Sequence, residues 1–173
     1  MRIEDVNVKD AKRLLEIYGP YVENTAISFE YKVPSIEEFE NRIINITKKY
    51  PYIKIIDDEN KIVGYAYANS FKAREAYKYD VEVSIYLDSS QRGKGYGKAL
   101  YSELEKRLKQ MGIINVYACI TMPMQKSKYS TEASYHFHLR QGFELVGTFK
   151  HCGYKFDEWF NMIWMAKEIW LFC

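Results

Sequence analysis

The glycine-rich segment QRGKGYGKAL, residues 91–100, constrains the fold of this chain more than any other part of the sequence. It follows a run of alternating apolar and polar residues (81–87) that predicts a strand, and it precedes a helical pattern. Glycine recurs at positions 93, 95 and 97, so neighbouring backbone N–H groups can point into one concavity. Because a helix N-terminus carries partial positive charge, this arrangement predicts a strand–loop–helix unit that binds a phosphate or pyrophosphate.

The spacing of the glycines narrows the kind of phosphate ligand. A Walker A loop, GxxxxGK[ST], requires glycine five residues after Gly93, where this chain has Lys98. The dinucleotide fingerprint GxGxxG requires glycine at the same position and fails for the same reason. Another nucleotide, or a glycine-rich turn without a ligand, remains open from spacing alone.

Length and composition indicate one globular domain, residues 1–173. Apolar residues make up 47% and charged residues 28%, and the net charge of +2 is too small to predict a nucleic-acid partner. The sequence shows no signal peptide and no apolar run long enough to span a membrane, so we expect a cytoplasmic protein without a membrane partner. The three cysteines are widely and irregularly spaced, which predicts free thiols and no metal site.

The periodicity of the apolar residues predicts a mixed α/β domain, with parallel pairing where helices connect strands. The first helix is expected to end near Gly19-Pro20, and Ser35 fits the N-cap of the second. Helices are predicted over residues 11–18, 36–49, 95–111 and 131–141, and strands over residues 52–56, 62–70, 81–87, 116–120, 143–150 and 159–166.

Six segments then resemble the phosphinothricin N-acetyltransferase-like branch of the GNAT superfamily, in order and in spacing. They are TAISFEY (25–31), YPYI with DENKIVGYAYA (51–68), REAYKYDVEVSIYL (74–87), QRGKGYGKAL (91–100), SYHFHLRQGFELVGTF (134–149) and CGYKFDEWFNMIWM (152–165). The resemblance covers nearly the whole chain. It implies the GNAT acyl-CoA N-acyltransferase fold, acetyl-CoA as cosubstrate, direct acetyl transfer to a primary amine, and no metal.

The resemblance also assigns the residues that would hold acetyl-CoA. The backbone of the strand end is expected to bind the pantetheine amides, and the glycine loop the pyrophosphate. Thr131 replaces the asparagine that the family has three residues before Ser134, and residues 123–130 look like an insertion beside the cleft. The implied cofactor residues are Ile85, Tyr86, Leu87, Arg92, Gly93, Lys94, Gly95, Tyr96, Gly97, Lys98, Thr131 and Ser134.

Acetyl transfer to an amine requires a base for the ammonium proton and a proton for the departing thiolate. The resemblance implies Glu82 as the general base, although a mid-strand carboxylate can simply face solvent. It places His138 where many GNAT enzymes carry a tyrosine general acid. An imidazole could perform either transfer, whereas a packed or helix-capping histidine is the alternative.

The acceptor is the least constrained part of the prediction. By resemblance we expect a small amino acid-like amine of the phosphinothricin or methionine sulfoximine type, and Arg74, Tyr77 and Lys78 are candidates to bind its carboxylate. A protein N-terminus, an antibiotic amine, or a non-catalytic acyl-CoA-binding module are the alternatives. The apolar run over residues 159–172 exceeds what one edge strand would expose and predicts a homodimer.

Overall fold

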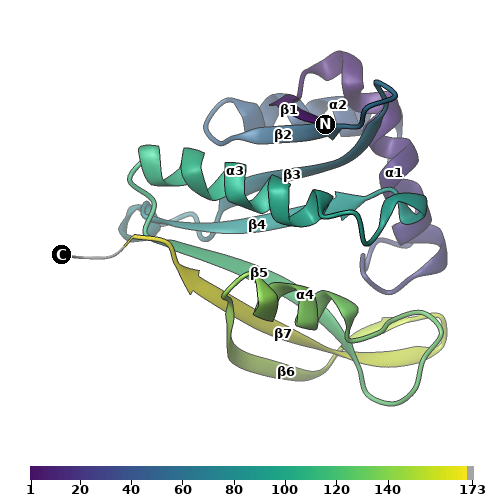
Figure 1. Cartoon of the computed structure of the whole chain (residues 1–173). Helices are drawn as coiled ribbons and strands as arrows, with labels where there is room; N and C mark the ends of the chain where they lie inside the picture. The colour runs from purple at the N-terminus through teal and green to yellow at the C-terminus, as the bar shows by residue number, and fades with distance from the viewer. Residues whose placement is uncertain (171–173) are drawn as a thin grey trace.

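The computed structural model describes residues 1–170, which form one seven-stranded sheet with helices on both faces (Figure 1). The strand order is β1-β2-β3-β4-β5-β7-β6. The strands are β1 (Arg2–Asp5), β2 (Tyr52–Ile56), β3 (Ile62–Ser70), β4 (Asp80–Leu87), β5 (Asn115–Pro123), β6 (Glu144–Lys155) and β7 (Glu158–Glu168). The helices are α1 (Ala11–Asn24), α2 (Ile36–Thr47), α3 (Tyr96–Gln110) and α4 (Ala133–Arg140).

The predicted mixed α/β fold is confirmed, and the single parallel pairing within residues 1–170 lies where a helix connects two strands. Strand β4 runs parallel to β5 after the crossover through α3, and all other neighbours in the sheet are antiparallel. Strand β7 lies between β5 and β6, so β6 forms the outer edge.

Alternation along the strands divides the core into two layers. Isoleucines 53 and 55 of β2 and valines 81 and 83 of β4 face α3, whose Leu100, Leu104 and Leu108 are buried. The opposite face of β2 and β3 presents Tyr52 and Tyr65 to α1 and α2. Helices therefore cover both faces of the sheet over β2, β3 and β4, whereas most residues of β6 are exposed.

Several elements differ from the prediction, and β6, predicted over residues 143–150, extends to Lys155. Helix α1 continues through Pro20 to Asn24, because burial of Tyr21 and Val22 offsets the hydrogen bond that proline removes. Strand β5 is longer than residues 116–120, since β7 pairs with it as far as Pro123. Strand β1 was missed, because its four residues carry little alternation and are defined by pairing with β2. The predicted N-cap is confirmed: the Ser35 hydroxyl accepts the Glu38 N–H at 3.1 Å.

A buried lysine joins the end of the β6–β7 hairpin to the end of α1. Lys155 is 2% exposed, and its Nζ donates to the carbonyl oxygens of Val22 at 2.6 Å, Thr25 at 2.9 Å and Ser28 at 2.7 Å. An ammonium has three donors, and all three are used here. The Tyr31 hydroxyl adds a hydrogen bond to the carbonyl of Tyr154. The hairpin thus fixes residues 22–31.

The predicted apolar C-terminal run divides between core and surface. Phe160, Ile163 and Met165 are buried within the domain, whereas Trp159 is exposed. Residues 171–173, which include the end of the run, lie outside the described residues. Within residues 1–170, no helix is both long and apolar enough to cross a membrane.

Candidate active site

The sheet opens between its two central strands. β4 and β5 pair only from Asp80 opposite Asn115 to Glu82 opposite Tyr117. Beyond these three residue pairs, β4 continues beside β3 and β5 continues beside β7. Among the described residues, no strand pairs with the β5-facing edge of β4 over residues 83–87. Except for the Leu87 carbonyl, which accepts the Tyr21 hydroxyl, the backbone donors and acceptors along this edge are therefore available to bind a ligand.

Two adjoining cavities follow the opening. The inner one, of about 60 Å³, lies between residues 83–86 of β4 and residues 118–120 of β5, with Tyr101 and His138 in its wall. The outer one, of about 280 Å³, leads from there to the glycine loop. Ile27, Ile85 and Ser134 line both, so the two form one channel from the middle of the sheet to the start of α3.

The structure brings most of the predicted cofactor residues to this channel. Those that line it are Ile85, Tyr86, Leu87, Arg92, Gly93, Thr131 and Ser134. The others, Lys94, Gly95, Tyr96, Gly97 and Lys98, do not line it but form the turn and the first residues of α3 behind it. Gly93 and Gly95 have φ of 80° and 83°, which explains why glycine suits both positions.

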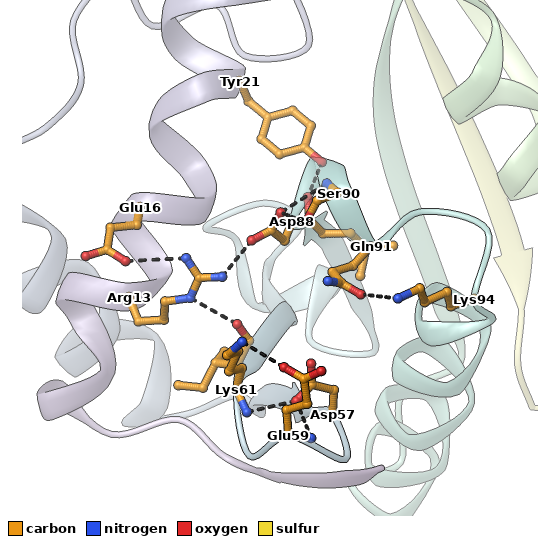
Figure 2. A network of polar contacts seen from close by, with 12 residues as sticks. Arg13, Glu16, Tyr21, Asp57, Glu59, Lys61, Asp88, Ser90, Gln91 and Lys94 are labelled. Carbon is orange, nitrogen blue, oxygen red and sulfur yellow. Dashed lines mark hydrogen bonds and ion pairs between the residues drawn. The ribbon is translucent and has the colours of Figure 1, made fainter.

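A network of polar contacts holds the glycine loop in place (Figure 2). Arg13 of α1 donates from Nη2 to Asp88 Oδ2 at 2.6 Å and from Nε to the Ile62 carbonyl at 3.0 Å. Asp88 in turn accepts the N–H of Ser90 at 3.1 Å, at the start of the loop. The Lys94 ammonium donates to Gln91 Oε1 at 2.7 Å. These contacts tie the start of the loop to α1.

Sequence reasoning missed several residues of the channel, among them Tyr21 and Arg140. The Tyr21 hydroxyl donates to the Leu87 carbonyl at 2.5 Å, and the Arg92 guanidinium lies 5.7 Å from the centre of its ring. Arg140, from the last turn of α4, supplies a second guanidinium to the outer cavity. Both lie outside the glycine motif in the sequence, and no spacing rule connected them to it.

Glu82 lies where the pairing of β4 with β5 ends. It shares one face of β4 with Ser84 and Tyr86 and is half-buried. Burial raises the pKa of its carboxyl above the usual range, and the nearby Lys72 ammonium opposes this shift. Glu82 itself lines neither cavity, but its neighbour Val83 lines the inner one, and a carboxylate of raised pKa beside that cavity suits proton abstraction.

His138 is 4% exposed and is engaged at both ring nitrogens. Its Nδ1 lies 2.7 Å from the Ser134 carbonyl, which can only accept, so Nδ1 carries the proton. Its Nε2 therefore accepts a hydrogen bond from the Tyr101 hydroxyl at 2.8 Å. Burial lowers the pKa of His138 to about 4, so the ring is neutral at neutral pH. The geometry favours a neutral His138–Tyr101 pair at the wall of the inner cavity.

The three predicted acceptor residues lie apart from the channel. Arg74, Tyr77 and Lys78 are exposed in the β3–β4 connection, and Tyr77 packs against Phe71 at 5.9 Å between ring centres. They do not line either cavity, so their role stays a prediction.

Residues 123–130 dock beside the channel. The Tyr129 carbonyl accepts the N–H of Ala26 at 2.8 Å, and the Tyr129 ring stacks on Phe156 at 4.2 Å. The segment therefore supports the residues around Ile27 that line both cavities. Among residues 1–170, no group of three or more His, Cys, Asp or Glu side chains is arranged to hold a metal ion.

Residues 3–164 match the protein family described as acetyltransferase (GNAT) domain. The chain belongs to the GNAT acetyltransferase family. The predicted family and enzyme class are thereby confirmed: this GNAT protein is an acetyl-CoA-dependent acyltransferase.

Individual relatives cover nearly the whole chain. A phosphinothricin N-acetyltransferase of Streptomyces coelicolor is 30% identical over 93% of this chain and 92% of its own length. An L-methionine sulfoximine/L-methionine sulfone acetyltransferase of Pseudomonas aeruginosa is 31% identical over 96% and 94%. The crystal structure of a GNAT superfamily phosphinothricin acetyltransferase from Sinorhizobium meliloti, in complex with acetyl-CoA, superposes with a TM-score of 0.88 at 36% identity, covering 96% of this chain and 87% of that one.

Proposed function

We propose that this GNAT enzyme transfers an acetyl group from acetyl-CoA to the primary amine of a small amino acid-like acceptor, by direct attack with Glu82 as general base. The observation that carries the proposal is the position of Glu82, half-buried at the point where β4 and β5 separate. The acceptor class is supported by the names of relatives that act on phosphinothricin and on methionine sulfoximine or sulfone.

The channel suits acetyl-CoA in shape and chemistry. The unpaired edge of β4 at residues 83–87 offers backbone groups for the pantetheine amides, and Thr131 and Ser134 line the same wall. At the other end, Arg92 and Arg140 supply positive charge for phosphates beside the glycine loop. Acetyl-CoA supplies the activated acyl group, and its thiolate is a good leaving group.

We assign proton abstraction to Glu82 and a different part to His138. With Nδ1 bonded to the Ser134 carbonyl and a pKa of about 4, His138 is a weak base. Its Nε2 accepts from Tyr101, so the two side chains form a neutral donor–acceptor pair beside the inner cavity. Burial also raises the pKa of the Tyr101 hydroxyl, so neither member of the pair readily gains or loses a proton. We propose that the pair orients the departing thiolate, which leaves as the anion and takes its proton from solvent, while Glu82 passes the ammonium proton to solvent.

The test is acetyl-CoA turnover, measured by free-thiol release, with L-amino acids that include phosphinothricin, methionine sulfoximine and methionine sulfone. Peptides and aminoglycosides serve as contrasting amines. We expect turnover with one amino acid class, and a fall in kcat of about 100-fold in Glu82→Gln with acetyl-CoA affinity retained. Glu144→Gln, an exposed carboxylate at the start of β6, is the matched control.

Other outcomes would favour one of the alternative functions. Turnover with peptides or aminoglycosides alone would indicate a protein N-terminal or antibiotic amine acetyltransferase. Binding of CoA without turnover of any amine would indicate a non-catalytic module. Equal loss of CoA binding in Glu82→Gln would contradict its role as base.

We further propose that the enzyme is a homodimer. Strand β6 is an edge strand, and its Leu145, Val146 and Phe149 side chains are exposed. An apolar edge of this kind favours association with another copy. Sedimentation equilibrium at micromolar concentration is the test, and a monomer mass would contradict the proposal.

A further inference from the structure

A pocket lined by tyrosines lies on the α1/α2 face of the sheet. We call it the tyrosine pocket; Tyr18, Tyr52, Tyr65, Tyr67, Tyr86 and Arg42 form most of its wall. Its volume of about 300 Å³ is at the lower end of the range for small-ligand sites, ~300–1,000 Å³. Only Tyr86 belongs to the residues predicted to bind acetyl-CoA.

The deepest wall presents hydroxyl groups that lack protein partners. Tyr65 is 1% exposed and Tyr52 is 3% exposed, yet neither hydroxyl forms a hydrogen bond with another of residues 1–170. By contrast, the Tyr18 hydroxyl pairs with Ser28 Oγ at 2.7 Å. Burial raises the pKa of Tyr52 and Tyr65 well above the usual range, so both keep their protons and can donate. Neither hydroxyl is among the side-chain atoms that are both shielded from solvent and unpaired, so both are open to the pocket and can donate to a ligand or water there.

The charge around the pocket is not positive despite Arg42. The Arg42 guanidinium is paired with Glu30 at 2.7 Å and also with Glu38. One cation is thus matched by two carboxylates, and Glu82 and the Lys72 ammonium near it add one charge of each sign, so the carboxylates are in excess by one. The pocket therefore offers neutral donors and aromatic walls but disfavours an anionic group.

The tyrosine pocket adjoins the reaction centre at two points. Asn69, at its mouth, lies directly opposite Glu82 in the β3–β4 ladder, which places neighbouring side chains about 5 Å apart at Cβ. Tyr86 lines both this pocket and the inner cavity of the channel. A single small molecule can therefore place its amine at Glu82 and its side chain in the pocket.

We propose that the tyrosine pocket receives the side chain of the acceptor, and that it selects an uncharged side chain ending in hydrogen-bond-accepting oxygens. This inference rests on the proposed function, which it refines. A sulfone, sulfoximine or amide matches the donors of Tyr52 and Tyr65. A phosphinate, which is an anion at neutral pH, meets the acidic surroundings of Arg42 and is disfavoured.

The experiment compares kcat/KM for three acceptors with Tyr65→Phe and the wild-type enzyme. L-Methionine sulfone carries the oxygens, L-methionine is the same skeleton without them, and phosphinothricin carries the anionic group. We expect the wild type to prefer the sulfone over both. Tyr65→Phe should lower the sulfone-to-methionine ratio about fivefold to tenfold, with the KM for acetyl-CoA unchanged.

Two further variants sharpen the comparison. Tyr50→Phe removes a buried hydroxyl that bonds Ser70 outside the pocket, so the ratio should stay at its wild-type value. Glu30→Gln removes one carboxylate beside Arg42 and should raise the phosphinothricin-to-sulfone ratio about threefold or more.

The outcomes separate this inference from the proposed function. If amino acids are acetylated but the Tyr65→Phe ratio stays within twofold of the wild type, the pocket proposal is overturned and the function stands. A wild-type preference for phosphinothricin over the sulfone overturns it as well. If no amine is turned over, calorimetric titration with methionine sulfone tests the pocket directly. Binding to the wild type that is lost in Tyr65→Phe supports the pocket proposal. Equal binding to the wild type and to Tyr65→Phe, or no binding to either, overturns it.

Discussion

Replacement of Lys155 by methionine should strongly destabilise the fold, because one ammonium serves three carbonyl groups. Its Nζ lies 2.6–2.9 Å from the carbonyl oxygens of Val22, Thr25 and Ser28, and the side chain is 2% exposed. Val22 belongs to the last turn of α1, whose carbonyls have no partner within the helix. Methionine matches the length of the lysine stem but donates no hydrogen bond.

The magnitude follows from two opposing contributions. A hydrogen bond to a charged group contributes about 1.5–3 kcal/mol, so three contribute about 4.5–9 kcal/mol. Burial of an ammonium costs several kcal/mol, which the variant no longer incurs. We expect a net loss of about 3 kcal/mol in the free energy of unfolding. For a domain of this length, that lowers Tm by about 6–12 °C.

Urea unfolding at pH 7 measures this loss directly. The midpoint should fall while the slope of free energy against urea concentration stays constant. Lys150→Met, an exposed position on the same strand, is the matched control and should change stability by less than about 0.5 kcal/mol. A loss in Lys155→Met no larger than that of the control would refute the argument that the three carbonyl contacts fix residues 22–31.

Two predictions concern protons. Burial raises the pKa of Glu82, and the positive charge of Lys72 opposes this shift. Lys72→Met removes that charge, so the acid limb of the kcat/KM profile should move to higher pH. A move to lower pH would contradict the assignment of Glu82 as the base. Burial lowers the pKa of His138 to about 4, so between about pH 6.5 and pH 4 the unfolded chain binds a proton that the folded chain excludes. The free energy of unfolding should therefore fall by up to about 3 kcal/mol as the pH falls through this window, in urea titrations of the wild type. His138→Gln should flatten this dependence, whereas the exposed His136→Gln should not.

The parts of the fold set by local sequence could be predicted well. The glycine loop, the start of α3 and the β2–β3 hairpin follow from turn residues and periodicity within a few positions. Ser35 likewise identified the start of α2, because N-cap chemistry depends on four consecutive residues. By contrast, α1 continues past Pro20 because of tertiary burial of Tyr21 and Val22, and a local rule cannot include that contribution.

The candidate site divides in the same way. The glycine motif correctly predicted that Arg92, Gly93 and the end of β4 line the channel, because these residues are close together in the sequence. Arg140 lines the same cavity but belongs to α4. Arg42 and Tyr65 line one pocket only because α2 packs on the sheet. The proximity of residues that are distant in the sequence depends on how helices and strands pack, and a single sequence does not show it.

The separation of β4 from β5 gives this sheet two inner edges in addition to its two outer ones. Exposed strand edges invite other chains to pair with them, and proteins commonly shield them with charges, bulges or helices. Here the shield is geometric, because the edges diverge from a short shared seam at Asp80–Glu82 and are flanked by α4 and residues 123–130. A strand inserted between the two inner edges would need a gap of constant width along its whole length. The wedge-shaped opening does not provide such a gap, so it disfavours the insertion of a strand while it leaves the backbone of β4 accessible to a narrower ligand.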